Sequence, residues 1–175
     1  MSPTEIDLRD YVRDVPDFPK PGILFKDISP LLASPRAFRA AVDRMASAFR
    51  DREIGAIAAP EARGFLFGTP LALALGVPFV PIRKPGKLPA ATVSLEYDLE
   101  YGTDTLQVHR DAFKPGARVL LVDDVLATGG TIRACRDLVR QSGAVVVASA
   151  FALELTFLGG RAKLVPGEVF SLLSY

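Results

Sequence analysis

Four short apolar runs recur along the chain, and segments with a helical pattern separate them. The runs cover residues 54–59, 77–82, 118–122 and 144–153. After Ser34, a good N-cap, and Pro35, which suits the first helical turn, apolar residues recur at helical spacing. Two further helices are predicted, one over 64–75 closed by Gly76 and one over 131–142 ended by Gly143.

The apolar runs are continuous rather than alternating, and helical segments lie between them. This order is typical of a parallel sheet whose two faces are both covered by helices. Buried short helices are the alternative, but Val and Ile crowd these runs and favour strands. The pattern therefore predicts an α/β fold with a mainly parallel sheet flanked by helices.

Residues 83–109 have a different texture. Their first part is basic and interrupted by Pro and Gly, while 92–108 is rich in β-prone residues broken at Tyr101 and Gly102. We expect a mobile loop that leads into a hairpin. Long insertions of this kind in compact domains are usually functional.

Composition narrows the class of protein. The chain has 175 residues, of which 49% are hydrophobic and 23% charged, which predicts a single domain over residues 1–175. A net charge of +1 gives no global field for nucleic acid or for an anionic membrane, so we expect neither as a partner. The single cysteine, Cys135, and an N-terminus without an apolar leader segment lead us to expect a cytoplasmic protein.

The most informative segment is 119–131, an apolar strand followed by an acidic pair and a Gly-rich turn. If the strand ends at Val122, Asp123 and Asp124 emerge at the carboxyl edge of the sheet, where open α/β folds bind ligands. The turn 127–131 combines two glycines, two hydroxyls and the start of a helix, which suits a phosphate monoester. Acids that accept from sugar hydroxyls beside a phosphate site predict a ribose phosphate as ligand.

Other interpretations of this segment are weaker. It is neither a Walker A loop nor a dinucleotide-binding turn, because the required Lys and glycine spacing are missing. Solvated aspartates at a strand end would be favoured for any single residue, and a magnesium-binding acidic pair would lack the following Thr-Gly-Gly-Thr. The whole run resembles the phosphoribosyl diphosphate (PRPP) motif of the type I phosphoribosyltransferases.

Further segments resemble the adenine phosphoribosyltransferases of that family and extend the resemblance over almost the whole chain. They cover residues 21–30, 61–68, 83–89 and 99–102. One departure is Ala62, which stands where the family commonly has Ser, so a hydroxyl contact is lost there.

The resemblance implies a fold with a base-binding hood within residues 1–33, and with the loop and hairpin 83–109 lying over the site. It also implies transfer of a phosphoribosyl group from PRPP to adenine, with Mg²⁺ as cofactor and a homodimer as assembly. No residue is expected to ligate the metal directly, because PRPP, pyrophosphate and water would hold it.

Roles for individual residues follow from the same resemblance together with the chemistry of the side chains. Asp123 and Asp124 would hold the ribose, and Ala127, Thr128, Gly129, Gly130 and Thr131 the 5′-phosphate. Arg63, Arg83, Lys84 and Lys87 would bind pyrophosphate. Phe25 and Val125 would sandwich adenine, while the carbonyl of Leu24 accepts from its amine and the N–H of Lys26 donates to its ring. Glu100 would be the general acid/base, and Tyr101 would pack over the closed site.

Two rival functions stay open at this point. One is a phosphoribosyltransferase for xanthine or hypoxanthine, whose carbonyl in place of the amine reverses hydrogen-bond polarity. The other is a regulator that senses PRPP without catalysis, although such proteins usually carry an added DNA-binding module or a basic face, which this chain lacks.

Overall fold

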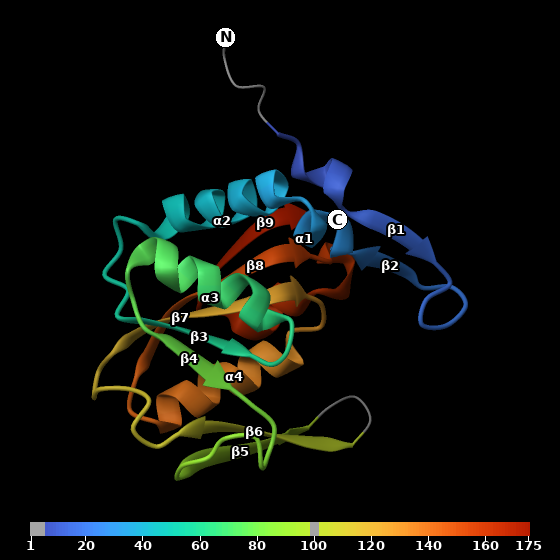
Figure 1. Cartoon of the computed structure of the whole chain (residues 1–175). Coiled ribbons are helices and arrows are strands. Elements are labelled where there is room, and N and C mark those ends of the chain that lie inside the picture. Colours follow the sequence, from blue (N-terminus) through green and yellow to red (C-terminus); the bar gives the residue numbers. More distant parts are fainter. Residues whose placement is uncertain (1–5, 99–101) are drawn as a thin grey trace.

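The computed structural model describes residues 6–98 and 102–175. Within these residues the central sheet has five parallel strands in the order β4-β3-β7-β8-β9 (Figure 1). The strands are β3 (Ala56–Pro60), β4 (Phe79–Ile82), β7 (Arg118–Leu126), β8 (Val145–Glu154) and β9 (Glu168–Ser174). The parallel sheet confirms the prediction from the continuous apolar runs, and β9 adds a strand that those runs do not include.

Helices cover both faces of this sheet (Figure 1). They are α1 (Ser29–Ala33), α2 (Pro35–Phe49), α3 (Gly64–Leu75) and α4 (Gly130–Gln141). Along β7, Leu120 and Val122 belong to the cluster beneath α2 and α3, whereas Val119 and Leu121 belong to the cluster beneath α4. Successive side chains of a strand point to opposite faces, so β7 contributes to both halves of the core.

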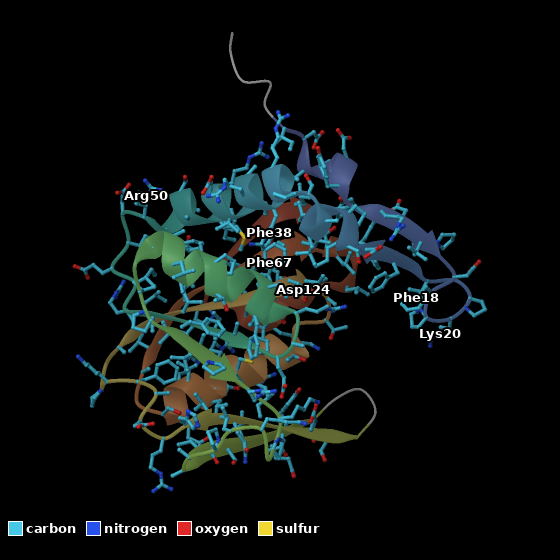
Figure 2. All side chains as sticks on the ribbon, viewed as in Figure 1. Phe18, Lys20, Phe38, Arg50, Phe67 and Asp124 are labelled. Carbon is cyan, nitrogen blue, oxygen red and sulfur yellow. The ribbon has the colours of Figure 1, made fainter. Side chains whose placement is uncertain are left out.

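Local signals in the sequence set the helix boundaries. The Ser34 side chain accepts a hydrogen bond from the backbone N–H of Ala37, which caps α2 as predicted. Gly76 ends α3 in the left-handed conformation, at φ +68°. The rings of Phe38 and Phe67 meet edge to face with centroids 5.6 Å apart, and join α2 to α3 (Figure 2).

Two antiparallel hairpins flank the sheet. Strands β1 (Arg13–Pro16) and β2 (Leu24–Asp27) form the first, on the side toward which the central strands point (Figure 1). Strands β5 (Thr92–Asp98) and β6 (Thr103–His109) form the second, which packs on α4 and confirms the predicted hairpin. The remaining short elements are the 3₁₀ helices η1 (Leu8–Tyr11), η2 (Thr156–Leu158) and η3 (Gly160–Leu164).

The end of β7 differs from the prediction. The strand does not end at Val122 but continues through the acidic pair to Leu126. It continues because β8 runs beside it, with Asp123 opposite Phe151 and Val125 opposite Leu153. Asp124 is therefore buried within the strand instead of lying exposed beyond its end.

None of the helices within 6–98 and 102–175 combines the length and apolar character that a membrane span requires.

Candidate active site

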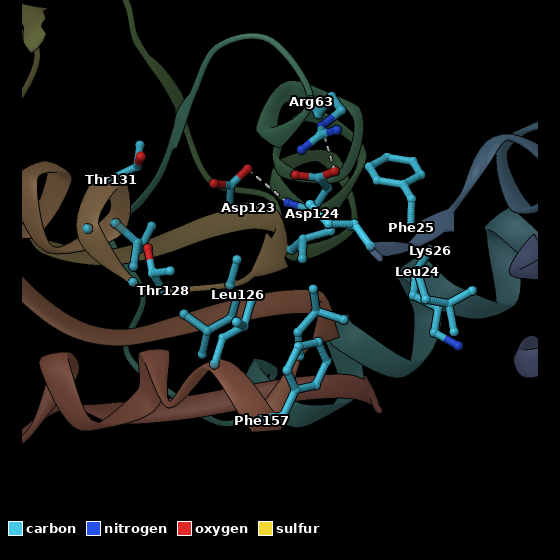
Figure 3. A pocket seen from close by; sticks show the side chains of 18 of the residues that line it. Leu24, Phe25, Lys26, Arg63, Asp123, Asp124, Leu126, Thr128, Thr131 and Phe157 are labelled. Atoms are coloured by element: carbon cyan, nitrogen blue, oxygen red, sulfur yellow. Dashed lines mark hydrogen bonds and ion pairs between the residues drawn. The ribbon is translucent and has the colours of Figure 1, made fainter. Parts of the chain in front are cut away.

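A cavity of about 690 Å³ lies at the carboxyl end of the central sheet (Figure 3). Four parts of the chain line it: the turn and strand of the first hairpin, Arg63 just before α3, the end of β7 with the start of α4, and the segment after β8. The lining residues are Gly22–Lys26 in the hairpin, Arg63, Asp123–Ile132, and Leu155, Phe157 and Leu158. The structure thus brings together every predicted contact of the base, the ribose and the 5′-phosphate, together with Arg63, a predicted pyrophosphate contact.

The acidic pair occupies one wall of this cavity. Asp124 is only 3% exposed, and its Oδ2 lies 2.8 Å from Nε of Arg63. Oδ1 of Asp123 accepts from the backbone N–H of Asp124 at 2.9 Å. Burial and the neighbouring charge of Asp124 raise the pKa of Asp123 well above its ordinary value. Burial also raises the pKa of Asp124, although Arg63 opposes that shift. The carboxyls are held at an electrostatic cost that a ligand with hydroxyl donors would relieve.

The phosphate segment 127–131 combines a turn with a helix N-terminus. Gly129 has φ +79°, which favours glycine, and α4 begins at the next residue. The first N–H groups of a helix have no partner within it, and the helix dipole makes this end attractive to anions. Thr128 and Thr131 lie on the same stretch (Figure 3). The geometry therefore suits a phosphate group.

The first hairpin, which occupies the position predicted for the hood, contributes Gly22–Lys26 to the cavity wall. The ring of Phe25 packs edge to face on Phe18 with centroids 5.1 Å apart. Nζ of Lys26 binds Asp14 at 2.6 Å and lies 4.2 Å from the ring centroid of Tyr175. These contacts occupy the Lys26 side chain, so what this residue can offer a ligand is its main chain.

Most of the predicted pyrophosphate contacts lie outside the described lining of the cavity. Arg83 donates from Nε and Nη2 to Oε2 of Glu61, at 3.1 and 2.9 Å. Lys84 pairs with Asp104, which raises the pKa of this lysine. Arg83, Lys84 and Lys87 are not among the described residues that line the cavity. Of the four predicted pyrophosphate contacts, only Arg63 lies in its wall.

Comparison with known proteins decides the family. The phosphoribosyl transferase domain matches residues 27–160. An adenine phosphoribosyltransferase of Rhodopirellula baltica is 58% identical over 97% of this chain and 82% of its own length. The chain belongs to the adenine phosphoribosyltransferases of the type I phosphoribosyltransferase family.

Solved members of this family share the fold. The crystal structure of adenine phosphoribosyltransferase from Thermoanaerobacter pseudethanolicus has a TM-score of 0.92 and 55% identity, covering 96% of this chain and 98% of that one. The enzyme from Trypanosoma brucei, solved with AMP, pyrophosphate and ribose-5-phosphate, has a TM-score of 0.86 and 30% identity, covering 98% and 81%. The resemblance inferred from the sequence motifs is confirmed.

Two predicted residues cannot be placed in this phosphoribosyltransferase site. Glu100 and Tyr101 lie outside the described residues. Their roles as general acid/base and as a closing side chain stay predictions.

The structure adds lining residues that sequence reasoning missed. Leu155, Phe157 and Leu158 follow β8 and form part of the cavity wall, where Phe157 is 73% exposed (Figure 3). The signal in the sequence was weak, because Thr-Phe-Leu after an apolar run resembles any strand end. An exposed aromatic ring in the cavity wall offers a flat apolar surface on which a planar ligand can pack.

Proposed function

We infer that this protein transfers the 5-phosphoribosyl group of PRPP to adenine, giving AMP and pyrophosphate. The observation that carries this inference is the cavity itself, which is lined by residues of β2, by the acidic pair and by the phosphate segment. The identity of 58% with an adenine phosphoribosyltransferase supports the same reaction.

The edge of β2 supports main-chain recognition of the base. Residues 24 and 26 alternate with 25 along the strand, so the carbonyl of Leu24 and the N–H of Lys26 point to the same side. Pro16 stands opposite Leu24 in the register and has no N–H to donate. Pro16 and Leu24 therefore cannot exchange both hydrogen bonds of a bonded pair. This favours an arrangement in which the backbone groups of Leu24 and Lys26 face away from β1 and into the cavity. One acceptor and one donor at this spacing fit the amine and the adjacent ring nitrogen of adenine.

Beside the base, we assign Phe25 and Val125 to its two faces, because both line the cavity. Asp123 and Asp124 would then accept hydrogen bonds from the ribose hydroxyls. The 5′-phosphate would occupy the segment 127–131, whose backbone N–H groups and hydroxyls suit it.

Pyrophosphate would leave from the anomeric carbon as the imidazole nitrogen of adenine attacks it. Of the four cations assigned to pyrophosphate, Arg63 already lines the cavity. The diphosphate would also be bound by Arg83, Lys84 and Lys87. Arg83 would leave Glu61 and Lys84 would leave Asp104, and each would gain a new anionic partner. Exchanging one anionic partner for another costs less free energy than leaving a cation unpaired. Glu100 would take the proton released from the base, and Tyr101 would cover the closed site and exclude water.

We propose that Mg²⁺ enters with PRPP. No cluster of three or more potential ligands among His, Cys, Asp and Glu occurs within 6–98 and 102–175. The carboxylates of Asp123 and Asp124 fit an ion held mainly by ligand oxygens, because they can accept from its waters. When bound, the ion would neutralise charge on the departing diphosphate.

We also propose a homodimer that uses the outer face of α3. Leu66 and Leu73 are 41% and 81% exposed on this helix and lie about two helical turns apart, on the same face. Arg63 precedes the same helix, so a second copy on this face would lie close to the cavity. Sedimentation of Leu73→Asp should show monomer where the parent shows dimer. A parent that sediments as monomer at assay concentration would contradict the dimer.

The decisive assay measures pyrophosphate release from PRPP with adenine, hypoxanthine or xanthine as the base. Release with adenine alone supports the proposed reaction. Release with an oxopurine instead would assign the other specificity, because its carbonyl reverses the hydrogen-bond polarity at Leu24. PRPP binding without release on any base would identify a sensor.

A further inference from the structure

Glu154 is a buried carboxylate at the end of β8, outside the cavity. It is 4% exposed, and Arg161 grips both of its oxygens, with Nε 2.9 Å from Oε1. The hydroxyl of Ser171 donates to Oε2 at 2.5 Å. The Arg161 guanidinium holds the pKa of Glu154 below its ordinary value. Both oxygens of Glu154 are thus bound, by Arg161 in η3 and by Ser171 in β9, so the carboxylate holds these two elements in a defined position.

Glu154 and Arg161 flank a six-residue loop, residues 155–160, that we call the wall loop. Its first part lines the cavity through Leu155, Phe157 and Leu158. Its last residue, Gly160, lies directly on the phosphate segment: a Cβ there would be 2.1 Å from the carbonyl oxygen of Ala127 and 3.0 Å from the N of Gly129. The wall loop therefore touches both the base side and the phosphate side of the cavity.

The two ends of the wall loop are held differently. Its beginning is fixed by backbone bonds, from Leu155 N–H to Leu126 at 2.9 Å and from Thr156 N–H to Tyr175 at 2.9 Å. Its end has a backbone bond from Ala162 N–H to Gly159 at 3.1 Å and, in addition, the Arg161 side chain, which also donates from Nη1 to the carbonyl of Val169 at 2.9 Å. Arg161 follows Gly160 directly, so whatever displaces Arg161 displaces the residue packed on the phosphate segment.

We propose that Glu154 and Arg161 are positioning residues, an inference that rests on the proposed function. They set the distance between the cavity-lining part of the wall loop and the phosphate segment. Neither side chain is among the described residues lining the cavity, so both act through the wall loop. Weakening the pair lets Gly160 move away from Ala127 and Gly129. Binding of PRPP then suffers, while the groups assigned to the reacting atoms stay unchanged.

Arg161→Lys and Glu154→Gln test this, because both keep the volume and lose the two-oxygen grip. The matched control is the exposed pair Arg52 and Glu168, through Arg52→Lys and Glu168→Gln, whose side chains are 45% and 47% exposed. Kinetics of pyrophosphate release with adenine are combined with hydrogen exchange of a peptide spanning 155–160. We expect KM for PRPP to rise at least about fivefold with kcat within about threefold, and faster exchange in that peptide alone. The control variants should match the parent in both readouts.

Several results would overturn the proposal. Folded Arg161→Lys and Glu154→Gln proteins with the parental KM for PRPP would show that the pair does not shape the site. Failure of both to fold, or a uniform rise in exchange over the whole chain, would assign the pair to global stability instead. A parent without adenine-dependent pyrophosphate release would contradict the proposed function itself, and direct calorimetry of PRPP binding to the same variants would still decide the positioning role.

Discussion

Replacing Asp123 with Asn removes one of two carboxylates that oppose each other in the cavity wall. The amide keeps an oxygen that can accept from the backbone N–H of Asp124, now 2.9 Å from Oδ1. It also leaves the ion pair between Arg63 and Asp124 intact, at 2.8 Å. The substitution therefore changes charge at this position with little change in shape.

The expected effect on stability follows from the pKa of Asp123, which burial and the Asp124 charge raise well above 3.8. In the window above 3.8 the folded state binds more protons than the unfolded state, so this carboxyl lowers stability as pH rises through the window. Asn removes that penalty. We expect a gain of about 0.5–2 kcal/mol in the ligand-free protein, typical of relieving a strained functional site. For a chain of this length the gain corresponds to roughly 1–8 °C in Tm.

Binding should move in the opposite direction. A hydrogen bond from a ribose hydroxyl to a carboxylate contributes about 1.5–3 kcal/mol, so its loss weakens PRPP binding by roughly 10–150-fold. Asp123→Asn is thus expected to be more stable and less able to bind. That combination distinguishes a ligand-binding carboxylate from a structural one.

Calorimetry checks both effects. Tm is measured without ligand at about pH 4 and about pH 7.5, where the gain should be small and large respectively. The affinity for PRPP is then titrated near neutral pH. Asp137→Asn is the control, because Asp137 is 42% exposed and its ion pairs are 3.8–4.0 Å long, so its stability change stays under ~0.5 kcal/mol. An Asp123→Asn protein that is less stable than the parent near pH 7.5, or that binds PRPP equally well, would refute the reasoning.

Three further changes test other parts of the site. Gly129→Ala would place a Cβ 2.6 Å from the Gly160 oxygen at φ +79°, and should raise KM for PRPP by about tenfold or more. The control Gly143→Ala, at φ +80° in open space, should lower only Tm. Equal kinetic effects of the two substitutions would contradict the close packing at Gly129. Glu100→Gln should lower the single-turnover rate of AMP formation by ~10²–10⁴ with little change in affinity, and an unchanged rate would remove Glu100 from catalysis. Phe157→Ala, at a ring 73% exposed, should raise KM for adenine by about tenfold while stability shifts by under ~0.5 kcal/mol; a parental KM would exclude the ring from base binding.

The sequence by itself determined the local elements and the class of ligand. Ser34 capped a helix and Gly76 ended one at the predicted positions, because capping depends on neighbouring residues only. Continuous apolar runs required a sheet buried on both faces. The acidic pair and the Gly-rich turn predicted a ribose phosphate site, since their chemistry is contained in one short segment.

Tertiary structure decided which distant residues meet. The end of β7 depends on β8 pairing beside it, which no local pattern in 118–126 specifies. Arg63 was predicted to bind pyrophosphate and was found paired with Asp124, a contact that exists only because β3 and β7 are neighbours in the sheet. The wall loop lines the cavity only because β8, which precedes it, pairs with β7. Contacts of this kind depend on strand order, which is set by burial over the whole sheet and not by residues close in the chain.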